Sequence, residues 1–225
     1  MQVTRIFLVR HGETTLVAED RFAGSTDAPL SDAGRIQAER LGVRLARESF
    51  AAVYASPMSR TMDTASLVGR PHGLLPIPTD GLREIDHGRW EGMRRCDVES
   101  QFAEEYAAWE EDPFTCAPEG GETGLAVTAR ALPVVRDIVD RHQGQQVLVV
   151  SHKATIRLLF SILLGFEPRG YRDRLDQLPC CLNIVDLKGH GRARLVLFND
   201  VSHYASVPTM PHERLSKWWD PQEKP

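Results

Sequence analysis

The chain has 225 residues, of which 42% are hydrophobic and 26% charged, values that are ordinary for a folded globular protein. This length suits one α/β domain. The formal net charge is −4, so no overall positive field attracts nucleic acid or an anionic membrane. Any polyanion must instead be bound by a local group of cationic side chains.

The N-terminus has only a short apolar run, without a basic segment or a small-residue cleavage site, so it does not resemble a signal peptide. No apolar stretch approaches the roughly 20 residues that span a bilayer. We therefore expect a cytoplasmic protein. The cysteines at 96, 116, 180 and 181 lack the spacing of a zinc site or a redox pair, and we expect four free thiols.

Short runs rich in apolar and β-branched residues predict the strands of one sheet. They are residues 4–9, 52–55, 75–78, 147–150, 182–187 and 194–198. The first run is apolar on both faces, which is typical of a strand buried in a parallel sheet. Prolines make residues 75–78 the weakest of these predictions.

Helical patterns lie between the predicted strands. They comprise residues 32–48 after a Ser31 or Asp32 cap, a helix that starts at Ser56-Pro57, residues 127–142, and residues 154–164 before Gly165. Strands that alternate with helices predict an α/β fold. Its central sheet should be mostly parallel, with helices on both faces.

The segment from about residue 88 to 121 interrupts this alternation. Val98, Phe102, Tyr106 and Trp109 would line one face of a single helix. We interpret the segment as a small helical cap insertion over the edge of the sheet, within one domain of residues 1–204. Residues 205–225 are expected to form an irregular tail.

Two predicted strands end in a histidine. Residues 4–9 lead into Arg10-His11-Gly12, and residues 147–150 lead into Ser151-His152. Ligands of an open α/β sheet bind at the carboxyl ends of its strands, so both imidazoles should face one crevice. Either histidine alone could simply close its strand, but the paired placement argues against that alternative.

Charged side chains follow two other predicted strands. Arg60 lies in a first helical turn, where the helix dipole disfavours a cation, so a bound anion or a surface salt bridge would explain it. Glu84 could protonate a leaving group or be an ordinary exposed acid. Together with the histidines and Arg10, these residues suit phosphoryl transfer in which cationic side chains do the electrostatic work of a metal ion.

In their order along the chain, these motifs resemble those of the histidine phosphatase superfamily, the phosphoglycerate-mutase-like proteins. The matching segments are Arg10-His11-Gly12-Glu13-Thr14, Phe22-Ala23-Gly24, Pro29-Leu30-Ser31, Ser56-Pro57-Met58-Ser59-Arg60, Leu82-Arg83-Glu84, Gly88-Arg89-Trp90-Glu91-Gly92, Pro118-Glu119-Gly120-Gly121-Glu122 and Ser151-His152. The resemblance runs from about residue 3 to residue 204 and implies the fold of that family.

The resemblance also implies roles for individual residues. His11 would become the phosphohistidine, Arg10 and Arg60 would bind phosphate, Glu84 would donate a proton and later activate water, and His152 would be the second histidine on the phosphate. Further substrate-binding positions would be Thr14, Ala23, Gly24 and Lys153. Asp86, His87 and Glu91 are not expected to take part directly, and Trp90, Asn199, Asp200 and His203 are interpreted as structural.

The implied partner is a small phosphorylated metabolite, with no metal, no cofactor, no nucleic acid and no membrane. A homodimer is compatible with the resemblance. The sequence departs from the family pattern at Val17, Ala23 and Lys153. The first two remove polar contacts, whereas Lys153 either contacts a further anionic group of the substrate or points into solvent, and we favour solvent.

We predict a metal-independent phosphomonoesterase. The short spacing from Glu84 to Gly92 is typical of the phosphatase branch, whereas glycolytic mutases carry a longer segment there. The alternatives are a phosphoglycerate-type mutase and a non-catalytic module that binds a phosphorylated ligand. A pH optimum between mildly acidic and neutral is expected, because His11 must be unprotonated while Glu84 is protonated.

Overall fold

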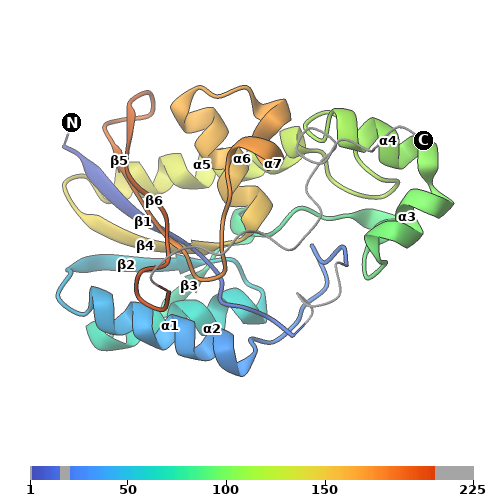
Figure 1. Cartoon of the computed structure of the whole chain (residues 1–225). Coiled ribbons are helices and arrows are strands. Elements are labelled where there is room, and N and C mark those ends of the chain that lie inside the picture. Colours follow the sequence, from blue (N-terminus) through green and yellow to red (C-terminus); the bar gives the residue numbers. More distant parts are fainter. Residues whose placement is uncertain (1, 16–20, 206–225) are drawn as a thin grey trace.

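A computed structural model describes residues 2–15 and 21–205 of the chain. The strands of this described part form one sheet in the order β3-β2-β4-β1-β5-β6 (Figure 1). They are β1 (Thr4–Arg10), β2 (Phe50–Ala55), β3 (Pro76–Pro78), β4 (Gln146–Ser151), β5 (Leu182–Leu187) and β6 (Ala193–Asp200). Every predicted strand is confirmed.

The sheet is mixed but mostly parallel, as predicted. Strands β1, β2, β3 and β4 run parallel, whereas β5 is antiparallel to both of its neighbours, β1 and β6. The carboxyl ends of β1, β2 and β4 therefore meet on one side of the molecule, and the histidine and arginine segments follow them there.

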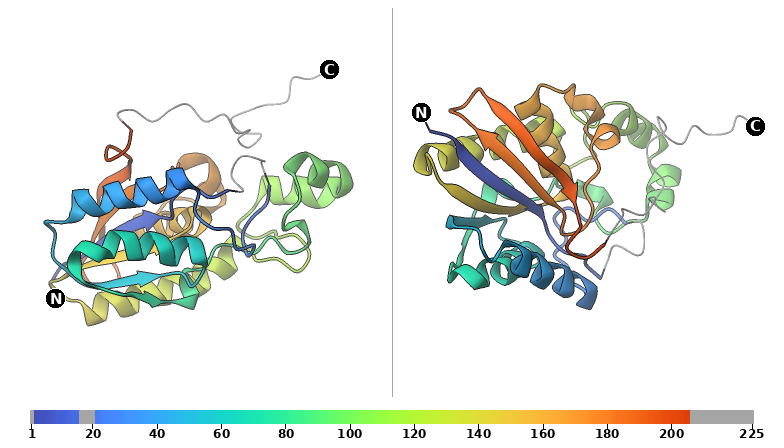
Figure 2. Two further views of the ribbon diagram at one scale, coloured as in Figure 1. Left: turned by 90° about the horizontal axis from the view of Figure 1, so that it is seen from below. Right: turned by 60° about the vertical axis from the view of Figure 1, so that its left-hand side comes forward.

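Helices cover both faces of the sheet (Figures 1 and 2). Helices α1 (Asp32–Leu45) and α2 (Ser59–Gly69) cover one face, and α5 (Gly124–Arg141) and α6 (Lys153–Leu164) cover the other. The alternation of side chains along a strand explains this. In β1, Phe7 and Val9 belong to one core cluster together with α1 and α2, whereas Ile6 and Leu8 belong to the other, together with α5 and α6.

Helices α1, α5 and α6 begin close to the predicted positions, at Asp32, Gly124 and Lys153. Ser31 caps α1 by accepting a hydrogen bond from the Gly34 N–H at 3.1 Å. Helix α6 ends at Leu164 and is capped by Gly165, whose φ of 74° suits glycine. Short 3₁₀ helices span Arg70–His72, Asp80–Leu82, Gly88–Trp90 and Pro168–Gly170, and α7 spans Tyr171–Arg174.

The predicted start of α2 at Ser56-Pro57 is wrong, because the helix begins at Ser59. The carboxylate of Asp27, from a distant loop, accepts hydrogen bonds from the Ser59 N–H at 3.1 Å and from its hydroxyl at 2.9 Å. A partner far along the chain therefore caps this helix. The Ser56 hydroxyl lies against His152 instead.

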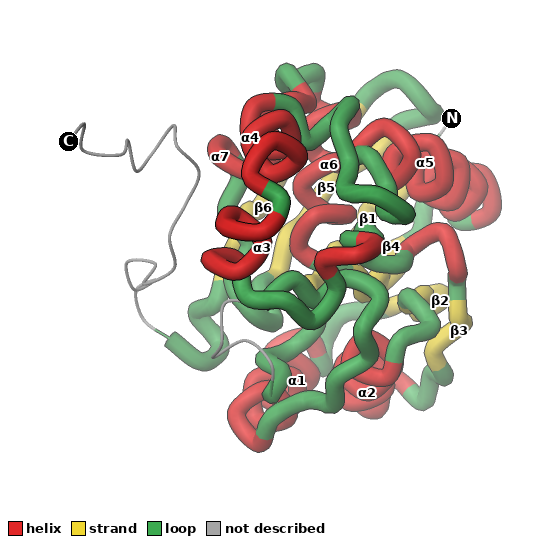
Figure 3. The backbone as a smooth tube through the Cα atoms, turned by 90° about the vertical axis from the view of Figure 1, so that its right-hand side faces the viewer, coloured by secondary structure: helices red, strands yellow, loops and turns green. Residues whose placement is uncertain are grey.

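The insertion contains two helices rather than the single one predicted. Helix α3 (Arg95–Gln101) and helix α4 (Ala103–Glu111) are separated by a break at Phe102. Both helices pack around Phe22 and Trp90, which one straight helix could not surround. The insertion lies beyond the carboxyl ends of the strands, not over a sheet edge (Figures 1 and 3).

The cysteines and the lengths of the helices bear on the remaining expectations. All four cysteines are free, as predicted. Among the helices of residues 2–15 and 21–205, none is long and apolar enough to cross a bilayer. Val17 and the tail beyond residue 205 lie outside the described residues.

Candidate active site

The backbone of His11 is held where β1 ends. Its N–H donates to the Ser151 carbonyl and its own carbonyl accepts from the Cys180 N–H, both at 3.0 Å. The ring Nδ1 lies 2.8 Å from the Gly12 carbonyl oxygen. A carbonyl oxygen only accepts, so Nδ1 carries the proton and Nε2 retains its lone pair.

Close backbone contact fixes the turn after His11. A Cβ atom on Gly12 would lie 2.6 Å from the Gly34 carbonyl oxygen, and one on Gly34 would lie 2.1 Å from the Glu13 carbonyl oxygen. The turn thus packs directly on the first turn of α1. Only glycine at both positions permits this approach.

The second predicted histidine, His152, is fully buried beside the first. The centroids of its ring and the His11 ring are 5.1 Å apart. Nδ1 of His152 accepts from Nε of Arg60 at 3.3 Å, because a guanidinium can only donate. Its Nε2 therefore carries the proton and donates to the Ser56 hydroxyl at 2.8 Å.

The surroundings of both histidines favour the neutral imidazole. Burial lowers the pKa of His11 well below its ordinary value, and the nearby Arg10 and Arg60 lower it further. Burial likewise lowers the pKa of His152, with added effects from His11 and Arg60. An unprotonated imidazole is the form that can act as a nucleophile.

Arg60 organises a loop on the opposite side of the site. Its guanidinium donates to the carbonyl oxygens of Gly24 at 2.9 Å and Thr26 at 2.8 Å. The carboxylate of Glu91 accepts from the N–H groups of the same loop, at 3.0 Å from Gly24 and 3.2 Å from Thr26. Burial would raise the pKa of Glu91, but the hydrogen bonds from the His87 and Ser25 N–H groups and the Thr26 hydroxyl hold it below its usual value.

Glu84 lies against the first turn of α6. Its Oε1 accepts from the Ile85 N–H at 3.0 Å and from the Thr155 N–H at 3.2 Å, and its Oε2 accepts from the Ala154 N–H at 3.1 Å. The Thr155 hydroxyl also donates to Oε1, at 3.2 Å. Oε2 thus has the fewer partners and retains accepting capacity.

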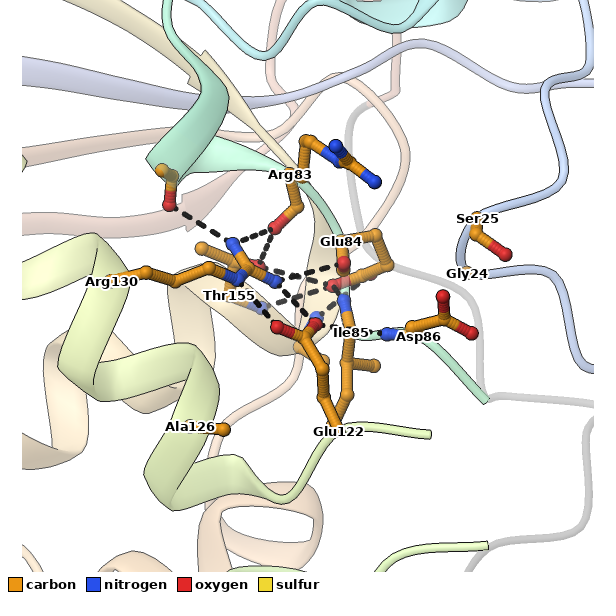
Figure 4. Close-up of polar contacts among 12 residues, drawn as sticks. Gly24, Ser25, Arg83, Glu84, Ile85, Asp86, Glu122, Ala126, Arg130 and Thr155 are labelled. Atoms are coloured by element: carbon orange, nitrogen blue, oxygen red, sulfur yellow. Dashed lines mark hydrogen bonds and ion pairs between the residues drawn. The ribbon is translucent and has the colours of Figure 1, made fainter. Parts of the chain in front are cut away.

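Arg130 and Glu122 hold the backbone that carries Glu84 (Figure 4). Arg130 on α5 donates to the carbonyl oxygens of Gly81, Arg83 and Glu84 at 2.8–3.0 Å. It also forms a two-point pair with Glu122, with both contacts at 2.8 Å.

A cavity of about 220 Å³ joins these groups. Of the predicted site residues, it is lined by Arg10, His11, Thr14, Ala23, Arg60, Glu84 and Lys153. His152 lies behind it against Arg60, and Gly24 contributes the carbonyl bonded to Arg60. Lys153, for which we favoured a side chain in solvent, is half-buried and lines the cavity at the start of α6.

The cavity wall also contains residues that sequence reasoning did not assign to the site. They are Arg21, Phe22, Thr26, Ala28, Ile85, His87, Arg95, Trp109, Ala154, Arg157, Tyr171 and Arg172. For Arg157 a signal existed, since it is the only charged residue in the apolar run 154–164. His87, which we did not expect to take part, lines the cavity. Trp90 is not in the wall but packs against Phe22 and Trp109, which are, and the Asn199 side chain accepts a hydrogen bond from the Leu178 N–H.

Known proteins resemble this chain over most of its length. A model of the histidine phosphatase superfamily (branch 1) matches residues 6–201. The chain is 34% identical over 206 residues to the glucosyl-3-phosphoglycerate phosphatase of Mycolicibacterium vanbaalenii, covering 86% of this chain and 88% of that protein. It is also 34% identical over 165 residues to phosphoserine phosphatase 1 of Hydrogenobacter thermophilus, covering 73% and 78%.

Solved structures agree as well. Bacillus stearothermophilus YhfR superposes with a TM-score of 0.83 at 32% identity, covering 89% of this chain and 98% of that one. The predicted fold is thus confirmed.

Proposed function

Since the chain belongs to branch 1 of the histidine phosphatase superfamily and is a phosphatase, we propose that it hydrolyses a small phosphorylated metabolite through a phosphohistidine on His11. The observation that carries this proposal is the tautomer of His11. Its Nδ1 proton is bonded to the Gly12 carbonyl, so Nε2 has a free lone pair in a cavity lined by cations.

In the first step, Nε2 of His11 attacks phosphorus, and the bond from phosphorus to the ester oxygen breaks. Arg10 and Arg60 stabilise the charge on the phosphoryl oxygens. Arg10 lines the cavity, and its Nε has no hydrogen-bond partner among the described residues, so the protein does not satisfy this guanidinium fully. Glu84 protonates the departing oxygen, for which Oε2, with its single partner, is the better placed of its two oxygens.

In the second step, water attacks the phosphohistidine and Glu84 takes up its proton. The bond between phosphorus and Nε2 breaks, which releases inorganic phosphate and restores neutral His11. The burial that keeps the pKa of His11 low favours this neutral product. No step requires a metal ion, since the cationic side chains supply the stabilising charge.

The named activities of the relatives favour hydrolysis over the mutase alternative. Both relatives described above carry the name of a phosphatase. A purely binding module would not need a neutral histidine and a carboxylic acid beside the same two arginines. Small phosphate esters remain the proposed substrate class, because the cavity is compact.

An aryl phosphate assay with added chelator tests this proposal. We expect wild-type turnover to persist, and we expect His11→Ala to lose nearly all of it. After rapid acid-free quench, the wild type should carry an acid-labile, base-stable phosphoryl group that His11→Ala lacks. A fully active His11→Ala protein would overturn the role of His11, and activity lost to the chelator would overturn metal independence.

A further inference from the structure

Beyond the phosphoryl site, the cavity continues to two arginines that the proposed reaction does not use. Arg157 lies on α6 and Arg172 on α7, and both line the same cavity as His11. Building on the proposed function, we propose that this pair binds a carboxylate of the substrate, so that the enzyme prefers phosphate esters that also carry a carboxylate group.

The guanidinium of Arg157 is only partly satisfied by the protein. Its side chain is 10% exposed, and Nη2 donates to Asp176 at 3.2 Å. Its Nε is buried without a hydrogen-bond partner in the described part of the chain. Leaving a buried charged donor unpaired is unfavourable, so this atom indicates a missing acceptor.

Arg172 also has a guanidinium N–H without a hydrogen-bond partner among the described residues, and its guanidinium lies against Trp109. Its guanidinium lies 4.0 Å from the centre of the Trp109 ring, which restrains its plane. Nη2 donates to Glu110 at 3.2 Å, whereas Nη1 is buried with no partner among the described residues. Each arginine thus uses a carboxylate on one side and keeps an unpaired donor on another.

The charges of the cavity wall favour a second anion. Among the described residues the wall has seven cationic side chains, namely Arg10, Arg21, Arg60, Arg95, Lys153, Arg157 and Arg172, and one carboxylate, Glu84. Arg10 and Arg60 suffice to balance a doubly charged phosphoryl group. Burial lowers the pKa of Arg157 to about 10, and the charges of Arg10 and Arg172 add to this effect despite Asp176. A nearby anion would stabilise the charged guanidinium.

The number of unpaired donors favours a carboxylate over a second phosphate. Nε of Arg157 and Nη1 of Arg172 are two guanidinium donors without a partner in the described part of the chain, and a carboxylate has two oxygens that accept from such donors. A second phosphate would bring a double charge and a third oxygen. The neighbouring acids Asp176 and Glu110 already take up part of the positive charge here.

The test compares 3-phosphoglycerate with glycerol 3-phosphate, two esters in which a carboxylate replaces a hydroxymethyl group. We expect the wild-type kcat/KM to be at least about tenfold higher for the carboxylate ester, the value of one charged hydrogen bond. Arg157→Gln and Arg172→Gln should each reduce this ratio toward one. Both should lower kcat/KM for 3-phosphoglycerate more than kcat/KM for glycerol 3-phosphate, because only the first ester carries the carboxylate that the arginines would bind.

Arg174→Gln is the matched control, because Arg174 lies on the same short helix but is exposed and outside the cavity wall. A wild-type ratio near one, or a ratio that neither substitution changes, would overturn the proposal. If Arg157→Gln fails to fold, Arg172→Gln alone decides. If the wild type hydrolyses no ester, the proposed function fails, and calorimetric binding of the same two esters still tests the arginine pair.

Discussion

Steric limits restrict which residue types can occupy some positions of this site, as much as chemistry does. Gly34 illustrates this, because the turn that carries His11 lies so close to it that a methyl group would overlap the Glu13 backbone. We expect Gly34→Ala to lower the free energy of unfolding by about 1–3 kcal/mol, the usual cost of overpacking. It should also lower kcat/KM, because the turn must shift.

Urea unfolding and aryl phosphate kinetics would measure both effects of Gly34→Ala. Gly191→Ala is the control, since a Cβ atom there would meet no atom within 4 Å. Equal stabilities for the two variants would show that the turn relaxes without cost.

The sequence identified the residues of the phosphoryl site better than those around it. His11, Arg60 and Glu84 follow strand ends, and that position alone predicts a common crevice. Arg172 and Trp109 could not be found this way, because α7 and α4 enter the cavity only through tertiary packing. The cap of α2 was missed for the same reason, since Asp27 is far from Ser59 in sequence.

At the level of elements, α5 positions the proposed proton donor without touching the cavity. Arg130 bonds the carbonyl oxygens before and at Glu84, so Arg130→Gln should let that segment move. We expect kcat to fall by up to roughly 10²-fold with little change in KM, because a small displacement of an acid slows proton transfer more than binding.

Steady-state kinetics across pH would test Arg130→Gln. Arg136→Gln serves as its control, because Arg136 is exposed on the same helix. A change in KM with an unaltered kcat would instead place Arg130 in substrate binding.

Strands and long helices were predictable because each is buried in a regular pattern. Helix α5 presents Val127, Ala131, Val135 and Ile138 to the sheet, at the spacing expected for one apolar stripe. The insertion has no such sheet to face. Its break at Phe102 follows from packing around Phe22 and Trp90, which no local pattern encodes.

The whole molecule should lose stability in acid because it buries neutral histidines. Burial lowers the pKa of His11 and His152 well below 6.5, and burial together with Arg44 lowers that of His203 to about 4. At a pH between the ordinary histidine pKa of about 6.5 and the lowered pKa of these buried histidines, the unfolded chain binds more protons than the folded one. This contribution to stability is therefore complete above about pH 6.5 and lost progressively as the pH falls toward about 4.

Urea unfolding at about pH 7.5 and about pH 5 would show the loss, within the window where histidines titrate. His203→Gln should reduce the difference between the two conditions, because it removes one of the imidazoles whose pKa is lowered by burial. Stability that rises in acid would contradict the burial of neutral imidazoles.

Helix α6 connects the two ends of the cavity. His152 precedes its first residue, Ala154 and Thr155 hold Glu84, and Arg157 follows about one turn later. With a rise of 1.5 Å per residue, the helix sets an axial offset of roughly 7 Å between the phosphoryl end and Arg157. The helix therefore sets the distance between the phosphate and the carboxylate of a substrate that binds at both ends of the cavity. One inserted residue would turn Arg157 by about 100° about the helix axis and change the length of substrate that can reach both ends.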